Sequence, residues 1–322
     1  MKAIIHTQYG PPEVLQLAEV LKPSPKANEV LVKVHATTVN RTDCGFRSAE
    51  YFISRFFSGL FRPKNQILGN EFAGEIVEVG KNIKSFQPGD KVFGYNEKTF
   101  GAHAEFMIMA EDAPIAAMPA NMTYEEAAPI LEGGHYALCD IRAAKVVKGQ
   151  HVLVNGASGS IGSAAVQLCK YFGADVTAVC ATQNIELLKS LGASTVIDFT
   201  KEDFTKLGQS FDFIFDAVGK SSFGKCKPLL KKYGIYISTE LGSGAQNPFL
   251  ALITPLLGGK KLLFPIPTIN KKDVIFLKEL VEAGQYKPVI DRTYTLDEIV
   301  EATRYVETGQ KTGNVVIIVS HE

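Results

Sequence analysis

The pattern of apolar and polar positions changes near residue 125. Before this point, short apolar runs are broken by Gly and Pro, and the clearest of them cover 30–34, 73–79, 91–93 and 105–108. Short runs with irregular spacers are typical of strands joined by loops. The first part of the chain is therefore predicted to form a mostly β domain.

After residue 125, apolar runs of strand length alternate with segments of helical periodicity. The predicted strands are 151–155, 176–180, 195–198, 211–216, 235–238 and 262–265, and the predicted helices are 161–172, 185–191 and 223–232. Strands that alternate with helices predict βαβ units and a parallel sheet. About six such strands make a doubly wound sheet of the dinucleotide-binding type.

The C-terminal segment has a third pattern. It predicts amphipathic helices at 273–283 and 296–307 and a last strand at 315–319. Thr295 stands at the N-cap position of the second helix and Glu298 follows three residues later, which is the spacing of a capping box. We expect this segment to return to the first domain, with its last strand pairing there.

Composition excludes several classes of protein. The 322 residues include 34 Lys and Arg against 34 Asp and Glu, and a zero net charge argues against a protein that coats nucleic acid or anionic membranes. No apolar run reaches the roughly 18 residues of a membrane-spanning helix. Five scattered cysteines without a Cys-x-x-Cys pair indicate a reducing compartment and no disulfide framework. Residues 1–5 resemble a strand more than a secretory signal, so a cytoplasmic location is expected.

A glycine-rich turn joins the first strand of the second part to its helix. Its residues are Gly156, Ala157, Ser158, Gly159, Ser160, Ile161 and Gly162. Small residues between a strand and a helix let the backbone approach a pyrophosphate, which the amides and the positive helix end then hold. The alternative is a tight turn without a ligand, but the strand before, the helix after and the second strand at the expected distance favour a dinucleotide.

The end of the second strand bears on the choice of coenzyme. An acidic residue there would bind the adenosine ribose 2′-hydroxyl, but the chain has Thr182, Gln183 and Asn184, which can donate hydrogen bonds to a 2′-phosphate. The nearest cation is Lys189. We therefore expect NADPH as the coenzyme, with NADH possible.

At this point the chain resembles a known family, the zinc-free quinone-oxidoreductase-like branch of the medium-chain dehydrogenase/reductase superfamily. The similar segments are 1–4, 10–15, 40–43, 68–80, 88–94, 154–159, 287–291 and 313–316. The resemblance implies a discontinuous GroES-like, mostly β substrate domain at 1–124 and 268–322. It also implies a Rossmann domain at 125–267, an active site in the cleft between the two, and a homodimer. Family position adds Val218, Leu241, Phe264, Ile266 and Asn314 to the residues expected around the coenzyme.

The resemblance also indicates whether the protein binds a catalytic zinc ion. Zinc alcohol dehydrogenases of the superfamily use a Cys where this chain has Asn40 and a His where it has Asn70, and their third ligand falls near Glu132. Catalytic zinc requires thiolate, imidazole or carboxylate donors. No Cys lies between Cys44 and Cys139 to form the four-cysteine structural lobe, so no zinc is expected.

Without a metal, hydride transfer from a nicotinamide to a quinone or an α,β-unsaturated carbonyl is the favoured reaction, because orientation and hydrogen-bond donors suffice. The candidate catalytic residues are Asn40, Asp43, Asn70 and Tyr51. Tyr95 and His135 are further candidates. For these two, and for Tyr51, a structural role is favoured. The expected substrate is a small apolar carbonyl or quinone.

One segment leaves its role open. Residues 46–64 contain five Phe and one Tyr among Arg47, Arg55 and Arg62, which fits the wall of an apolar substrate pocket, ordinary core, a dimer contact or a membrane-surface helix. Two other functions also stay open. One is a non-catalytic NADPH-binding sensor or partner-binding module. The other is an enoyl-thioester reductase that uses Arg47, Arg55, Arg62 and Lys64 to bind carrier phosphates.

Overall fold

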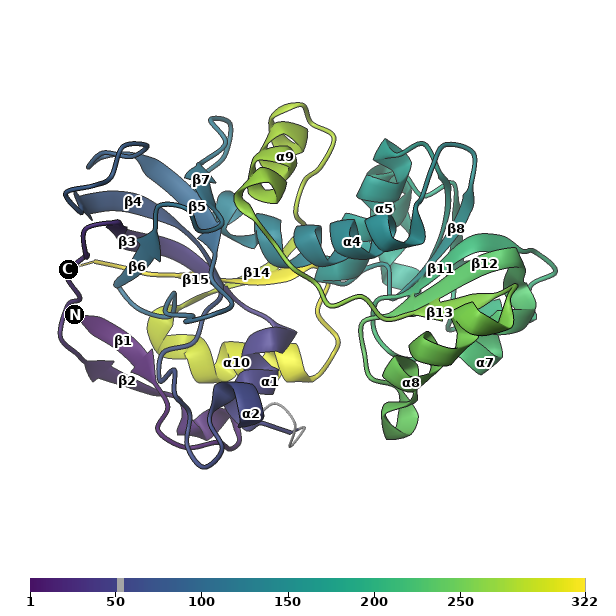
Figure 1. Ribbon diagram of the computed structural model, residues 1–322, viewed down its shortest axis with the longest axis horizontal. Helices are drawn as coiled ribbons and strands as arrows, with labels where there is room; N and C mark the ends of the chain where they lie inside the picture. Colours follow the sequence, from purple (N-terminus) through teal and green to yellow (C-terminus); the bar gives the residue numbers. More distant parts are fainter. Residues whose placement is uncertain (51–54, 322) are drawn as a thin grey trace. The chain divides into compact units, whose positions relative to one another are not determined.

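The computed structural model describes residues 1–50 and 55–321. The chain divides into two compact units (Figure 1). The first unit comprises Met1–Glu132, Ile269–Ala283 and Ile290–Glu322, and the second comprises Gly133–Thr268 and Gly284–Val289. The first unit is therefore built from both ends of the chain.

The second unit contains a six-stranded parallel sheet. Its order is β10-β9-β8-β11-β12-β13, which is the doubly wound order in which the chain starts at the centre and reverses direction once. The strands are β8 (His151–Asn155), β9 (Asp175–Cys180), β10 (Thr195–Asp198), β11 (Phe211–Asp216), β12 (Leu230–Ser238) and β13 (Lys261–Leu263). The predicted fold class is confirmed.

Helices cover the sheet of the second unit (Figure 1). α5 and α6 pack on β8, β9 and β10, while α7 and α8 pack on β12 and β13. Their bounds are α5 (Ser160–Tyr171), α6 (Ile185–Leu191), α7 (Phe223–Cys226) and α8 (Gln246–Ile253). The helix predicted at 223–232 is wrong, since α7 ends at Cys226, a 3-10 turn follows, and β12 begins at Leu230. Pro228 lies in that turn, where it cannot continue an α-helix.

The first unit contains a mixed sheet. Its path is β14-β15-β3-β4-β5-β7, and β6 pairs with β3. β15 pairs antiparallel with β3, as predicted for the returning C-terminal segment, and parallel with β14. The strands are β3 (Glu29–Val39), β4 (Glu71–Val79), β5 (Lys91–Tyr95), β6 (Phe106–Ala110), β7 (Ile115–Ala117), β14 (Ile290–Thr295) and β15 (Asn314–Ile318). A separate hairpin joins β1 (Lys2–Ile5) and β2 (Gln16–Glu19).

Short helices surround this sheet. They are α1 (Arg41–Ser48), α2 (Arg55–Ser58), α3 (Tyr124–Ala127), α9 (Lys271–Glu282) and α10 (Ile299–Glu307). The predicted capping box of Thr295 and Glu298 forms, one 3-10 turn before α10. α4 (Leu131–Ala144) starts in the first unit and continues in the second.

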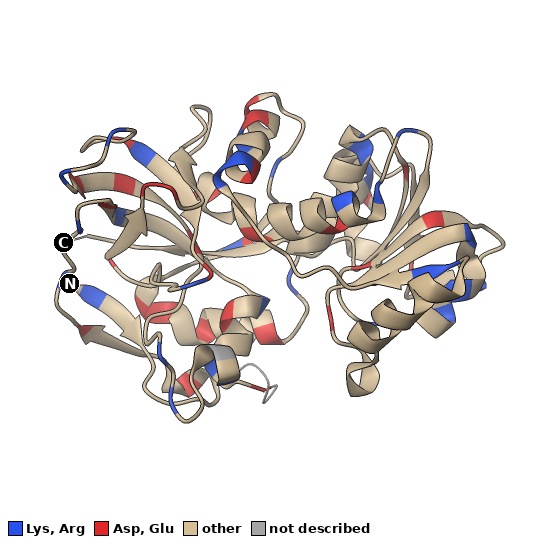
Figure 2. Cartoon of the chain, viewed as in Figure 1, with Lys and Arg blue, Asp and Glu red and all other residues tan. Residues whose placement is uncertain are grey.

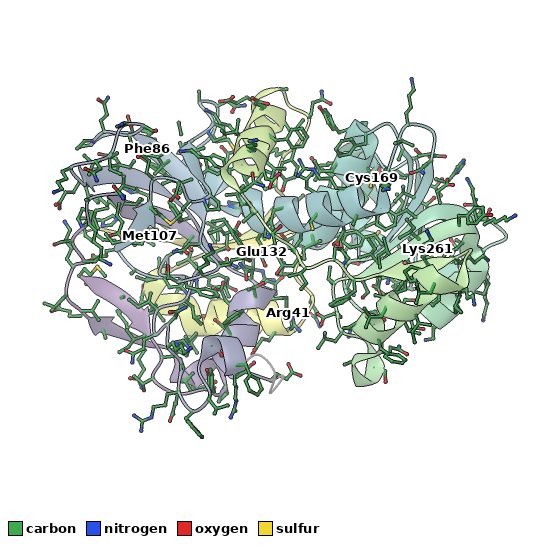
Figure 3. The ribbon with its side chains drawn as sticks, viewed as in Figure 1. Arg41, Phe86, Met107, Glu132, Cys169 and Lys261 are labelled. Carbon is green, nitrogen blue, oxygen red and sulfur yellow. The ribbon has the colours of Figure 1, made fainter. Side chains whose placement is uncertain are left out.

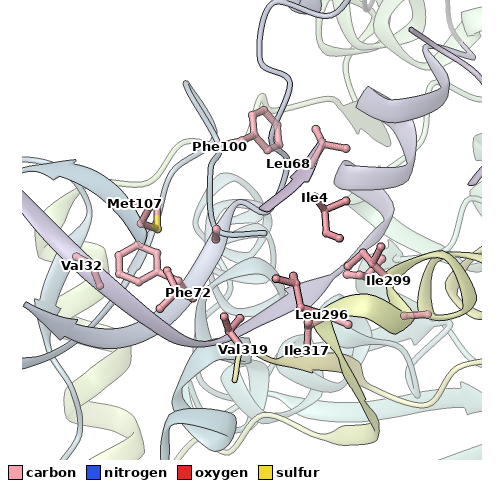
Figure 4. Packing of buried hydrophobic residues seen from close by; sticks show 14 of the residues in the cluster. Ile4, Val32, Leu68, Phe72, Phe100, Met107, Leu296, Ile299, Ile317 and Val319 are labelled. Atoms are coloured by element: carbon pink, nitrogen blue, oxygen red, sulfur yellow. The ribbon is translucent and has the colours of Figure 1, made fainter. Parts of the chain in front are cut away.

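The core of the first unit is made by residues from distant parts of the sequence (Figure 4). Ile4 and Phe72 from the N-terminal part pack in one cluster with Leu296, Ile299 and Ile317 from the C-terminal part. Each of these side chains is at most 7% exposed. Burial of large apolar side chains stabilises a fold by roughly 1.5–3 kcal/mol each, so the C-terminal segment is an integral part of this unit.

Charge is distributed unevenly in the second unit. Segment 217–268 contains seven lysines and one acidic residue, and the blue segments of Figure 2 gather around α7 and β12. The zero net charge of the chain therefore coexists with a local basic surface. Among the described residues, no helix is both long and apolar enough to cross a membrane.

Candidate functional site

The glycine-rich turn lies between β8 and α5. Gly156 has a φ of +73°, and a Cβ there would lie 1.5 Å from Val218 Cγ1. A Cβ on Gly162 would lie 2.1 Å from the Gly156 carbonyl oxygen. Both positions therefore require glycine, the first for its backbone conformation and its packing and the second for its packing. The turn therefore packs closely against the start of α5.

The same turn leaves room and hydrogen-bond donors for an anion. A Cβ on Gly159 would meet only the Gly156 oxygen, at 3.6 Å, so the space above Gly159 is open. The buried Ser160 hydroxyl has no hydrogen-bond partner among the described residues. Ser160 is also the first residue of α5, where amides lack partners within the helix. These features fit the pyrophosphate of a dinucleotide.

The remaining coenzyme candidates are spread over the two units. In the second unit, Val218 contacts the turn, Phe264 packs against the core, and Ile266 is 79% exposed. Leu241 follows β12, and its carbonyl oxygen accepts the amide of Asn247. Asn314 is buried at the start of β15 in the first unit.

A carboxylate that the sequence analysis missed lies beside the predicted 2′-phosphate site. Asp198, the last residue of β10, accepts a hydrogen bond of 2.5 Å from the Thr182 hydroxyl through Oδ2. Sequence reasoning searched only the end of β9, whereas β10 ends alongside it, with Asp198 opposite Cys180. The expected cation, Lys189, is paired with Glu186 at 2.8 Å.

In the first unit, the two asparagines at the expected metal-ligand positions contact each other directly. Asn40 Nδ2 donates to Asn70 Oδ1 at 2.7 Å, and Asn70 Nδ2 donates to both Tyr95 Oη and Glu132 Oε2 at 3.1 Å. Tyr95 Oη donates to the same Glu132 oxygen at 2.5 Å, and Thr42 Oγ1 donates to Glu132 Oε1 at 2.7 Å. Glu132, labelled in Figure 3, is therefore the common acceptor. We call these five residues the Glu132 network.

Two more buried carboxylates border the Glu132 network. Glu71 accepts the Thr38 hydroxyl and the backbone amides of Leu131 and Glu132, so it caps the start of α4. Asp43 accepts the amides of Gly69 and Asn40, while Asn40 Oδ1 accepts the amide of Asp43. Asn40 and Asp43 thus form a capping box at the start of α1. This local role explains why both residues are needed at this spacing.

Burial changes the acid–base properties of this cluster. Desolvation raises the pKa of Glu71 to about 8 and the pKa values of Glu132 and Asp43 to about 7. Donors such as Tyr95 oppose the shift at Glu132. Desolvation also lowers the pKa of Lys311 to about 8, with Glu132 acting in the opposite sense. Burial thus moves the pKa values of these carboxyl groups up, and that of the Lys311 ammonium down, toward neutral pH.

The raised pKa of Glu132 has a measurable consequence for stability. Between its unfolded pKa near 4.5 and its folded pKa of about 7, the folded protein binds more protons, so ionisation of Glu132 costs stability as the pH rises. We expect Glu132→Gln to become less destabilising relative to wild type from pH 5 to pH 7. Urea unfolding of both proteins across this range measures the difference, and a difference that grows with pH would contradict the assignment.

Segment 46–64 is only partly described, and Tyr51 lies outside the described residues. Phe46 packs against the core, with its ring centroid 4.8 Å from that of Phe100 and the two rings tilted by 54°, whereas Phe56 and Phe61 are 64% and 86% exposed. Arg47 is buried and pairs with Glu307 and the Gly10 carbonyl. The expectation that Arg47 binds carrier phosphates is therefore wrong. His135 is buried within α4 and its ring lies 4.6 Å from that of Tyr136.

Comparisons with known proteins agree with this architecture. Residues 26–119 match the family described as alcohol dehydrogenase GroES-like domain, and residues 191–317 match zinc-binding dehydrogenase. The chain is 35% identical to the 2-methylene-furan-3-one reductase of Solanum lycopersicum, over 98% of this chain and 79% of the relative. It is 30% identical to the NADPH-dependent alkenal/one oxidoreductase, chloroplastic, of Arabidopsis thaliana, with the same coverage. The quinone oxidoreductase structure from Coxiella burnetii has a TM-score of 0.88 at 28% identity, over 99% of both chains.

A two-unit fold of this kind, with a glycine-rich turn in its parallel sheet, defines an oxidoreductase of the dehydrogenase class. The chain belongs to the medium-chain dehydrogenase/reductase superfamily, in the branch of quinone oxidoreductases and alkenal reductases.

The residues at the expected metal positions do not fit a catalytic zinc. Both asparagine side chains are neutral amides, and their hydrogen bonds tie them to each other and to Glu132. Among residues 1–50 and 55–321, no group of three or more His, Cys, Asp or Glu could hold a metal ion. Although one matched family is described as zinc-binding, this donor set offers one carboxylate, Glu132, and two neutral amides, short of the three thiolate, imidazole or carboxylate ligands that a catalytic zinc takes from the protein.

Proposed function

We propose that this protein is a zinc-independent, NADPH-dependent reductase that transfers hydride to quinones or α,β-unsaturated carbonyl compounds. The observation that carries the proposal is the Glu132 network, in which amides and a carboxylate bind one another where zinc dehydrogenases place their metal ligands. The printed names of the relatives, which cover quinone and alkenal/one reduction, support the same substrate classes. NADPH is proposed as the preferred coenzyme because no acid follows β9 and one of these relatives is named for NADPH.

The nicotinamide coenzyme supplies the hydride in this reaction, and the protein supplies orientation and hydrogen-bond donors. Asn40 and Asp43 fix the start of α1, and Asn70 holds Tyr95 and Glu132 in place. We assign Asn40, Asp43 and Asn70 to orienting the acceptor side of the site, with Tyr51 retained as a candidate that contacts the acceptor. The turn from Gly156 to Gly162 binds the pyrophosphate.

Oxidation of NADPH in the presence of acceptors tests this function. A panel of an ortho-quinone, a para-quinone, a 2-alkenal and a small enone should accelerate loss of the nicotinamide absorbance. The rates should be unchanged after treatment with a zinc chelator, and metal analysis should find no stoichiometric zinc. Tight NADPH binding without turnover of any acceptor would instead support a non-catalytic binding module.

The enoyl-thioester alternative loses part of its basis in the structure. That alternative required four cations to bind the carrier phosphates, but one of them, Arg47, is buried against Glu307. Arg62 and Lys64 are exposed and stay available. Rates with an enoyl-CoA far above those with a simple enone would favour that reductase. The homodimer and the cytoplasmic location stay predictions.

A further inference from the structure

The Asp198 carboxylate accepts hydrogen bonds from two threonine hydroxyl groups, one that follows β9 and one that follows β10. Thr182 Oγ1 donates to Asp198 Oδ2 at 2.5 Å, and Thr200 Oγ1 donates to Asp198 Oδ1 at 2.6 Å. The Thr200 amide donates to Oδ1 as well, at 3.0 Å. A hydroxyl has a single hydrogen, so these bonds leave both hydroxyls with only lone pairs for a ligand.

The carboxylate is held in its ionised form. The hydrogen bond from Thr182, followed by that from Thr200, lowers the pKa of Asp198 to about 2. Lys201 Nζ lies 3.4 Å from Asp198 Oδ2, and its side chain is 67% exposed. Asp198 therefore carries a negative charge at neutral pH, and the neighbouring Lys201 ammonium is largely exposed to solvent.

The negative charge of Asp198 affects the choice between NADH and NADPH. Thr182 is one of the three residues at the end of the second strand, where the adenosine ribose of a dinucleotide binds. A ribose 2′-hydroxyl can donate its hydrogen to a threonine oxygen or a carboxylate. A 2′-phosphate has only acceptor oxygens and a negative charge, so it gains nothing from lone pairs and is repelled by the carboxylate. The Lys189–Glu186 pair adds no net positive charge.

We propose that Asp198 is a coenzyme-specificity residue, which turns Thr182 and Thr200 into acceptors and so keeps NADH usable beside NADPH. This inference rests on the proposed function, because it assumes that a nicotinamide dinucleotide binds at this edge of the sheet. Asp198 acts through the two threonines and is thus a positioning residue. Lys201 has the opposite effect, since its exposed ammonium attracts a 2′-phosphate.

Replacement of the carboxylate by an amide tests the inference. Asp198→Asn removes the charge and frees at least one threonine hydrogen, because the amide nitrogen donates where the carboxylate oxygen accepted. Affinities for NADPH and NADH are measured by fluorescence titration at fixed salt. The preference for NADPH over NADH is expected to rise at least about tenfold. The 2′-hydroxyl of NADH loses one short charge-assisted contact, and the 2′-phosphate of NADPH is no longer repelled by the carboxylate. Lys201→Gln should shift the same ratio toward NADH.

Asp203→Asn is the matched control. Asp203 lies in the same surface segment and accepts the amide and hydroxyl of Thr205, so this variant makes the same charge change without touching Thr182 or Thr200. Its NADPH-to-NADH ratio should stay at the wild-type value. An unchanged ratio in Asp198→Asn, or an equal shift in Asp203→Asn, overturns the inference.

The adenosine end can be tested apart from catalysis. Binding of 2′,5′-ADP and of 5′-AMP, measured calorimetrically for wild type and Asp198→Asn, should show the same shift in ratio as the full coenzymes. If the shift occurs but no acceptor is reduced, the reductase function fails and the specificity role of Asp198 stands. If acceptors are reduced and the ratio does not shift, the role of Asp198 fails alone.

Discussion

Replacement of Gly156 by alanine is expected to weaken NADPH binding about a hundredfold or more, because the amides that hold the pyrophosphate must move. Gly156 has a φ of +73°, and the new methyl group would lie 1.5 Å from Val218 Cγ1. The turn can accept the methyl group only by shifting its backbone or by displacing Val218. Fluorescence titration with NADPH measures the loss, and circular dichroism reports whether the sheet stays folded.

Gly208→Ala provides the control for this change. Gly208 belongs to the same unit, its φ lies outside the left-handed region, and a Cβ there meets no atom within 4 Å. It should bind NADPH as the wild type does. An affinity of Gly156→Ala within about threefold of Gly208→Ala would show that the turn does not hold the coenzyme through its backbone.

The second large effect concerns the Glu132 network. Glu132→Ala removes the acceptor of Tyr95 Oη, of Thr42 Oγ1 and of one of the two Asn70 Nδ2 hydrogens, while the other hydrogen still bonds to Tyr95 Oη. Buried donors without partners cost about 1–3 kcal/mol each, and the truncated side chain leaves a cavity. We therefore expect the free energy of unfolding to fall by about 3 kcal/mol or more. Chemical denaturation at pH 7 measures this quantity.

The control for Glu132→Ala is Glu301→Ala, which removes an exposed carboxylate from α10 in the same unit. It should change stability by less than about 0.5 kcal/mol. Asn70→Ala should lie between the two variants, since it removes one donor to Glu132 and leaves Tyr95 and Thr42 in place. A loss in Glu132→Ala as small as in Glu301→Ala would mean that the network contributes little.

The periodicity of the sequence was most informative where local signals agree. In the second unit, β8 and α6 have the predicted bounds. Gly192 ends α6, and β8 is an isolated apolar run with the length of a strand. The prediction failed at 223–232, where apolar and basic residues mimic a helix but Pro228 stops it and β12 takes over. α8 and β14 were not predicted, and neither has a simple apolar period.

From the residues alone, the candidate site could be predicted only where one local segment carries it. The turn at Gly156 and Gly162 is such a segment, since its glycine spacing between a strand and a helix can be recognised in the sequence. The Glu132 network is different, since its members come from separate elements and no spacing relates them. Only the family resemblance placed Asn40, Asn70 and Glu132 at related positions, and it did not predict their hydrogen bonds. Asp198 was missed for the same reason, because it ends β10 whereas its hydrogen-bond partner Thr182 follows the neighbouring strand β9.

The pairing of β15 with β3 affects how the protein folds during synthesis. Val315 lies opposite Val39, so the sheet of the first unit cannot be completed until nearly the whole chain has left the ribosome. Meanwhile residues 36–39 of β3, which β6 does not cover, present an open edge while the complete second unit is translated, and unpaired edges favour aggregation. Chaperone dependence and sensitivity to ribosome stalling should therefore be concentrated in the first unit, while the second unit has all its strands available earlier.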